Sequence, residues 1–182
     1  DAGSKGGGVF SRHDLEVLNS TISGNTATQG GGIYNDDGIL TIKNATITDN
    51  WAHYGGGIFW EGPGTNISLS NSIVADNTAS SETGFDLIAQ LSANKIPSGG
   101  YNIIGIDGLN AMLGDSTDIE GTYASPINPL LAPIANNGGS TWTHALLCGS
   151  PAANSGNPAI TEATDQRGVP RIQFGNPDCG AH

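Results

Sequence analysis

A stretch of about 25 residues occurs three times in the first half of this chain, and no other feature restricts the possible folds so strongly. Each copy opens with three glycines, at 6–8, 30–32 and 55–57. Two columns of asparagine recur with the glycines: Asn19, Asn44 and Asn71, and then Asn25, Asn50 and Asn77. A repeat of this length indicates stacked supersecondary units, each of which buries its apolar face against its neighbours.

Within each copy, apolar residues alternate with polar ones, as Leu15 and Val17 do on either side of Glu16. This period of two predicts short strands with one buried face, and the absence of a 3.6-residue period argues against helical repeats. Three short strands in a unit of about 25 residues are typical of one coil of a parallel β-helix, in which every coil pairs with the next. We therefore expect an all-β chain, a parallel β-helix or β-solenoid.

The repeat also suggests how one domain is divided along the chain. Residues 1–84 hold the three regular coils, and residues 85–125 keep short apolar runs without the period, which predicts an irregular fourth coil. In that coil, 84–91 and 99–106 read as strands, and 108–115 reads as one or two helical turns. Residues 126–182 carry most of the prolines, and we expect them to wrap the last coil as an irregular cap.

Two segments resemble known bacterial families. The repeat "GGGIYN…LTIKNATITDN" is similar to the Pmp-like repeats of bacterial surface proteins, which are right-handed parallel β-helices. The segment "INPLLAPIANNGGSTWTHALLCGSPAANSGN…TDQRGVPR…CGA" resembles the C-terminal part of choice-of-anchor Q β-helix proteins. Together the resemblances imply a right-handed parallel β-helix of about four coils with an irregular C-terminal cap, in a secreted or cell-surface protein.

The asparagine columns fit the corners of such coils, where a side-chain amide can satisfy backbone groups and bond to the amide one coil away. We expect an internal ladder of Asn19, Asn44 and Asn71, with the glycine triplets supplying positive φ at another corner. Asn19 and Asn44 also lie in glycosylation sequons, where a sugar would be incompatible with the ladder. The glycosylation candidate is therefore Asn66, in the loop "EGPGTNIS".

The two cysteines, Cys148 and Cys179, flank a long loop-like stretch. They could be free buried thiols, but a disulfide that closes this loop would stabilise the fold by roughly 3–4 kcal/mol. We predict that disulfide, and with it an oxidising, extracellular location.

The charge of the chain argues against nucleic acid as a partner, and its apolar content argues against membrane insertion. The chain has 17 acidic and 6 basic residues, a net charge of -11, and its bases are scattered. Without a basic patch, nucleic acid is not an expected partner. No apolar run approaches the roughly 18 residues of a membrane span, so we expect no membrane insertion.

Parallel β-helices often act on polysaccharides, and one acidic constellation suits that chemistry. Asp14, Asp36, Asp37 and Glu61 occupy corresponding parts of three coils, so stacking could align them on one face. A polysaccharide lyase or glycosidase needs converging carboxylates, and a lyase usually needs Ca²⁺. The alternative is a row of solvated loop residues. No motif predicts any other metal, a cofactor or a phosphate loop, and His144, next to leucines, reads as a buried structural histidine.

No helix or polar cap stands before the first repeat, and a bare β-helix end exposes strand edges and apolar core. We therefore expect self-association through the coil ends, a head-to-tail contact that can propagate into a filament. The first functional hypothesis is a non-enzymatic extracellular scaffold, adhesive module or filament subunit, with a polysaccharide or cell-surface molecule as a further candidate ligand. The alternative is a carbohydrate-active enzyme that uses the acidic row.

Overall fold

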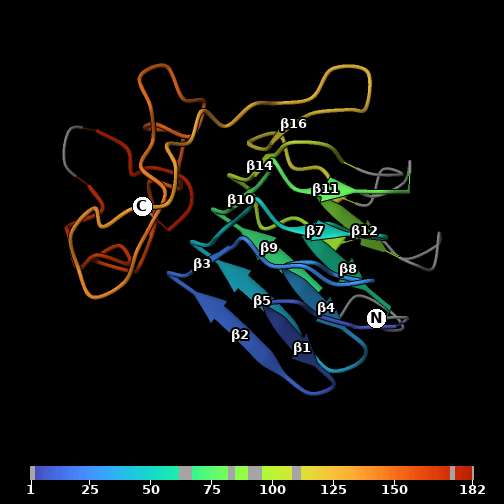
Figure 1. Ribbon diagram of the computed structural model, residues 1–182. Helices are drawn as coiled ribbons and strands as arrows, with labels where there is room; N and C mark the ends of the chain where they lie inside the picture. Colours follow the sequence, from blue (N-terminus) through green and yellow to red (C-terminus); the bar gives the residue numbers. More distant parts are fainter. Residues whose placement is uncertain are drawn as a thin grey trace.

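The computed structural model describes residues 3–61, 67–81, 85–89, 96–107, 112–172 and 175–181. Throughout these residues the regular structure consists of short β-strands and includes no helix, so the all-β prediction is confirmed (Figure 1). Nothing in the described part of the chain forms a helix with the length and apolar character that a bilayer crossing requires.

Most strands belong to three parallel sheets. The first runs β1 (Val9–Ser11), β4 (Ile33–Asn35), β8 (Ile58–Trp60), β12 (Leu87–Ala89). The second runs β2 (Leu15–Leu18), β5 (Leu40–Lys43), β9 (Ile67–Ser70). The third runs β3 (Thr21–Ser23), β6 (Thr46–Thr48), β10 (Ile73–Val74), β14 (Ile103–Ile104), β16 (Ile119–Glu120). Two smaller parallel pairs complete the strands: β7 (Trp51–Ala52) with β11 (Thr78–Ala79), and β13 (Ile96–Pro97) with β15 (Met112–Leu113).

The strands pair in the register that the repeat predicts. Leu15 lies beside Leu40, and Leu40 lies beside Ile67, so equivalent positions of successive copies are neighbours in the second sheet. Each set of three consecutive strands, one in each sheet, forms one layer, and the next set forms the layer beside it, an arrangement consistent with a β-solenoid. The inward-facing side chains form one continuous core, in which Leu40, Ile42 and Ile47 are fully buried.

The glycine triplets explain how closely the layers approach one another. The first glycine of each triplet has positive φ, 66° at Gly6, 63° at Gly30 and 61° at Gly55. At the second position a side chain has no room, because a Cβ on Gly31 would lie 2.4 Å from Gly56 O. A triplet is therefore a corner that no other residue type fits without displacing the next layer.

Residues 85–125 hold more regular structure than one irregular coil. β12 and β14 form inside the two segments predicted as strands. The segment 108–115 reads as helical turns in the sequence, but its described residues Met112 and Leu113 form β15. Since β14 and β16 are both members of the third sheet, this region adds two layers to it.

The C-terminal segment, residues 126–181, lies along the side of the stack instead of covering only its last layer (Figure 1). It touches four successive layers through hydrogen bonds. The pairs are Gln166 with Thr21, Ala181 with Thr46, Gly180 with Asn71, and Cys179 with Tyr101. The predicted cap is thus a lateral cover over the outer face of the third sheet, where Ile73 and Ile103 pack against Ala152 and Cys179.

The predicted disulfide between Cys148 and Cys179 is wrong, because both cysteines are free thiols. Cys179 is fully buried against the stack, with Sγ 3.0 Å from Tyr101 O and 3.3 Å from Ser72 O, whereas Cys148 is exposed. Burial raises the pKa of the Cys179 thiol. Packing and hydrogen bonds hold this segment in place, and the argument for an oxidising compartment from a disulfide no longer applies.

Candidate functional site

Each of the four carboxylates of the predicted acidic row has its own partner, and three of these partners lie in a different coil. Asp14 Oδ1 accepts a hydrogen bond from Ile39 N at 2.9 Å, and Asp37 Oδ1 accepts one from Gly38 N at 2.8 Å. The other two carboxylates form ion pairs: Asp36 with Arg12 at 3.0 Å, and Glu61 with Lys5 at 3.2 Å.

These contacts favour the solvated-row interpretation over a catalytic one. The Arg12 side chain is 65% exposed, and such a surface ion pair contributes only about 0–1 kcal/mol to stability. Within the described ranges, no three His, Cys, Asp or Glu side chains lie close enough together to share a metal ion.

The predicted asparagine ladder is present at one step only. Asn71 Nδ2 donates to Asn44 Oδ1 at 2.8 Å, and both residues are buried. Asn19 bonds instead to the C-terminal segment, donating to Thr164 O at 3.1 Å and accepting from Arg171 Nη2 at 2.6 Å. The three asparagines adopt positive φ, between 46° and 54°, which identifies this column as a corner of the backbone. Asn66 lies outside the described residues.

The continuous ladder is formed by the other asparagine column. Asn25 Nδ2 donates to Asn50 Oδ1, Asn50 Nδ2 to Asn77 Oδ1, and Asn77 Nδ2 to Asp86 Oδ1, each at 2.9 Å. All donors point the same way along the stack. The ladder ends at Asp86, which the repeat could not indicate because it follows Asn77 by only nine residues.

Asp86 is buried, and both its carboxylate oxygens accept hydrogen bonds. Oδ1 accepts from the backbone and side chain of Asn77, and Oδ2 accepts from Ile106 N at 2.7 Å. Burial raises the pKa of Asp86 to about 7, although the hydrogen bonds from Asn77 and Ile106 oppose that shift. Asp86 borders a pocket of about 360 Å³ together with Asp76, whose pKa is also raised by burial.

His144 ties the C-terminal segment to the third sheet. Its Nδ1 lies 2.8 Å from Ala132 O, and its Nε2 lies 2.9 Å from Ser23 Oγ. Because a carbonyl oxygen only accepts, Nδ1 donates to Ala132 O, while Nε2 shares a hydrogen bond with the Ser23 hydroxyl. Both ring nitrogens are thus satisfied in a buried site, which supports the structural interpretation of this histidine.

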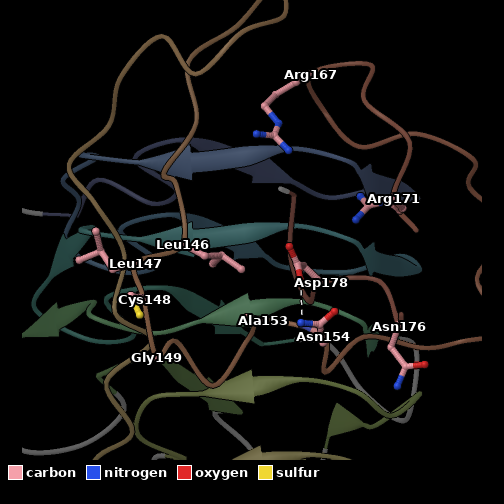
Figure 2. A pocket seen from close by; sticks show the side chains of 10 residues that line it. All are labelled: Leu146, Leu147, Cys148, Gly149, Ala153, Asn154, Arg167, Arg171, Asn176 and Asp178. Atoms are coloured by element: carbon pink, nitrogen blue, oxygen red, sulfur yellow. Dashed lines mark hydrogen bonds between the residues drawn. The ribbon is translucent and has the colours of Figure 1, made fainter. Parts of the chain in front are cut away.

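A pocket of about 420 Å³ opens in the C-terminal segment, and we call it the Arg171 pocket (Figure 2). Leu146, Leu147 and Cys148 form one wall, and Arg171, Asp178 and Asn154 form the wall opposite. The remaining lining residues are Gly149, Ala153, Arg167 and Asn176. Sequence reasoning missed this pocket because its lining residues come from separate stretches of the irregular C-terminal segment, and no period relates these stretches.

Arg171 is the unusual group of this pocket. Its side chain is buried, Nη1 donates to Gly180 O at 3.0 Å, and Nε has no hydrogen-bond partner in the described part of the chain. Desolvation lowers the pKa of Arg171, and the carboxylates of Asp165 and Glu162 oppose that shift. Arg167, by contrast, forms an ion pair with Asp165 at 2.5 Å.

Comparisons of the chain with models of protein families, with curated proteins and with solved structures gave no match.

Proposed function

We propose that the chain is a structural or adhesive module of a secreted or cell-surface protein, and that it works by stacking end to end with a second copy. In this proposal the parallel sheets wind into a right-handed β-helix of about four coils, similar to the Pmp-like and choice-of-anchor Q proteins. One observation carries the proposal: among the described strands, β1, β2 and β3 are the outermost members of the three sheets, and we call this side of the stack the first-layer end.

Apolar core is exposed at the first-layer end. Leu15 and Ile22 belong to the core cluster but are only partly buried. Their equivalents one layer further along, Leu40 and Ile47, are fully buried. A further layer of the same kind would remove this apolar surface from water, which is the main favourable term in protein association.

Hydrogen-bonding groups at the first-layer end also suit another parallel coil. The N–H groups of Leu15 and Asn19 bond to the neighbouring strand β5, and alternation along the strand turns the N–H of Glu16 toward the open edge. Asn25 Oδ1 accepts no hydrogen bond from any described residue. This oxygen could accept a hydrogen bond from a layer added beyond β1, β2 and β3, just as Asn50 Oδ1 accepts one from Asn25 Nδ2.

A second copy is the partner that this geometry favours. The sheets that begin at β1 and β3 end at β12 and β16, so each sheet has an outer strand at both ends of the stack. A head-to-tail contact between copies would continue the parallel pairing, and a contact of this type can propagate into a filament.

Light scattering over a concentration series tests the proposal with a matched pair of variants at one exposed edge position. Glu16→Pro removes the N–H that an incoming strand needs, and Glu16→Thr removes the same charge but keeps the N–H. We expect the mass of the wild-type protein and of Glu16→Thr to rise with concentration, and Glu16→Pro to stay monomeric with an unchanged circular dichroism spectrum. A wild-type protein that is monomeric throughout the series, or a Glu16→Pro variant that associates equally well, would overturn self-stacking.

The enzyme alternative has weaker support. A lyase or glycosidase acting through Asp14, Asp36, Asp37 and Glu61 needs carboxylates that face one substrate, and each of these carboxylates is engaged with a different partner. A polysaccharide or other cell-surface ligand is compatible with a scaffold, since binding needs no such convergence.

A further inference from the structure

We propose that the Arg171 pocket binds a hydroxylated carboxylate, such as one acidic sugar residue. The pocket lies in the C-terminal segment, and this proposal does not depend on stacking at the first-layer end.

The charge of Arg171 provides the first argument. The guanidinium is held by two neutral oxygens, Gly180 O and Asn19 Oδ1, and none of the described carboxylates lies within ion-pair distance of it. The side chain is only 6% exposed. A buried cation normally has an anionic partner, because removing its charge from water is costly. A carboxylate in the adjoining pocket would supply that partner.

Asp178, on the same wall as Arg171, defines a second feature of the ligand. Asp178 Oδ1 accepts a hydrogen bond from Asn154 N at 2.7 Å, and Oδ2 has no partner among the described residues. An ionised carboxylate only accepts hydrogen bonds, so Asp178 suits a hydroxyl donor. It would repel a compact dianion such as phosphate, since it faces the same small space as Arg171 (Figure 2).

The wall opposite Arg171 and Asp178 is largely apolar. Leu146 and Leu147 line the side across from Arg171, and the Leu146 side chain points toward Asp178 (Figure 2). Their side chains can pack against the C–H face of a sugar ring, and the volume of about 420 Å³ falls in the usual range for small-molecule sites. A cation for the carboxylate, acceptors for the hydroxyls and an apolar wall for the ring together describe an acidic monosaccharide.

Titration by NMR with three small probes tests this proposal on the whole chain. We expect glucuronate to bind saturably, with shifts at the backbone amides of Asn154 and Leu147, and to bind at least tenfold more tightly than neutral glucose. We expect acetate, which carries the charge without the hydroxyls, to bind at least tenfold more weakly than glucuronate. Equal binding of glucose, or of acetate, would overturn the proposal.

Variants separate binding from folding. Arg171→Gln should reduce glucuronate affinity at least tenfold, but this residue also anchors Gly180 and Asn19, so the variant could lose its fold.

Leu147→Glu avoids that difficulty because Leu147 is 47% exposed, and its new carboxylate would repel the ligand. Ile134→Glu is the matched control, since Ile134 is 42% exposed and does not line the pocket. We expect lost binding only in Leu147→Glu. A folded Leu147→Glu variant that binds glucuronate as the wild type does would contradict the site.

Discussion

At the scale of single residues, Asp86 combines burial with an ionisable group at the end of a hydrogen-bond ladder. Asn77 and Ile106 donate to its two oxygens, which favours the carboxylate, while the loss of water favours the neutral acid. The second effect dominates, because the pKa of Asp86 is raised to about 7. A protonated Asp86 is therefore favoured in the folded protein over a wide range of acidic pH.

This shift predicts how stability depends on pH. The folded-state pKa lies above the unfolded-state value, so the stabilisation is fully present below about pH 4 and is lost as pH rises to about 7. The loss is on the order of 4 kcal/mol at most. Asp86→Asn has no carboxyl to titrate at this position, so its free energy of unfolding, measured in urea, should lack this pH-dependent stabilisation. The free energies of unfolding of wild type and variant should therefore differ by an amount that changes between about pH 4 and about pH 7. Asp36→Asn, at an exposed ion pair, is the control and should keep the slope. Parallel pH profiles for Asp86→Asn and wild type would refute the assignment.

At the scale of elements, the ladder from Asn25 to Asp86 connects the corners of successive layers by side-chain hydrogen bonds. Asn50 both accepts from Asn25 and donates to Asn77, and its Nδ2 also reaches Ile22 O and Thr48 O. Thr48, Asn50 and Asn77 are buried, so their polar groups are removed from water. The ladder therefore contributes mainly by satisfying buried backbone groups that the strands leave unpaired at the corner.

A pair of alanine variants tests this contribution. Asn50→Ala should lower the free energy of unfolding by about 3 kcal/mol, because it leaves several buried partners without hydrogen bonds. Asn25→Ala should cost only about 1 kcal/mol, since Asn25 is partly exposed in the first layer. Denaturant unfolding of both variants measures the difference. Equal losses would show that the ladder is not the cause.

At the scale of the whole molecule, the C-terminal segment and the stack share one interface without a disulfide between Cys148 and Cys179. The segment contributes Cys179 and Ala152 to the cluster on the outer face of the third sheet, and it adds an ion pair from Glu162 to Lys43 at 2.9 Å. It thereby covers apolar side chains at Ile73 and Ile103 that would otherwise face water. Stack and segment should therefore unfold together.

The free thiols predict how the molecule responds to reductant. We expect excess dithiothreitol to leave the melting temperature unchanged, because no disulfide is present to be reduced. Cys148→Ser, at an exposed position, should also be neutral. Cys179→Ala should destabilise the fold by about 1 kcal/mol or more through the cavity it leaves. A clear fall in the melting temperature on reduction would contradict this account.

The period explains why so much of the fold could be predicted. Glycine triplets and alternating apolar residues act locally, so pairs such as Leu15 with Leu40 follow from counting along the chain. The choice between the two asparagine columns did not follow, because both have the same period. Only their surroundings differ. Asn19 Oδ1 accepts a hydrogen bond from Arg171, whereas the ladder that begins at Asn25 ends at Asp86.

The sequence by itself determined the layered parallel strands, the glycine corners and the alternation of core and surface, because each depends on a spacing that repeats. The tertiary structure alone decided the lateral position of the C-terminal segment, the free state of Cys148 and Cys179, and the pocket beside Arg171. Those features depend on contacts such as that between Arg171 and Asn19, which are 152 residues apart. No periodicity specifies such contacts, because they arise only where the irregular segment meets the completed stack.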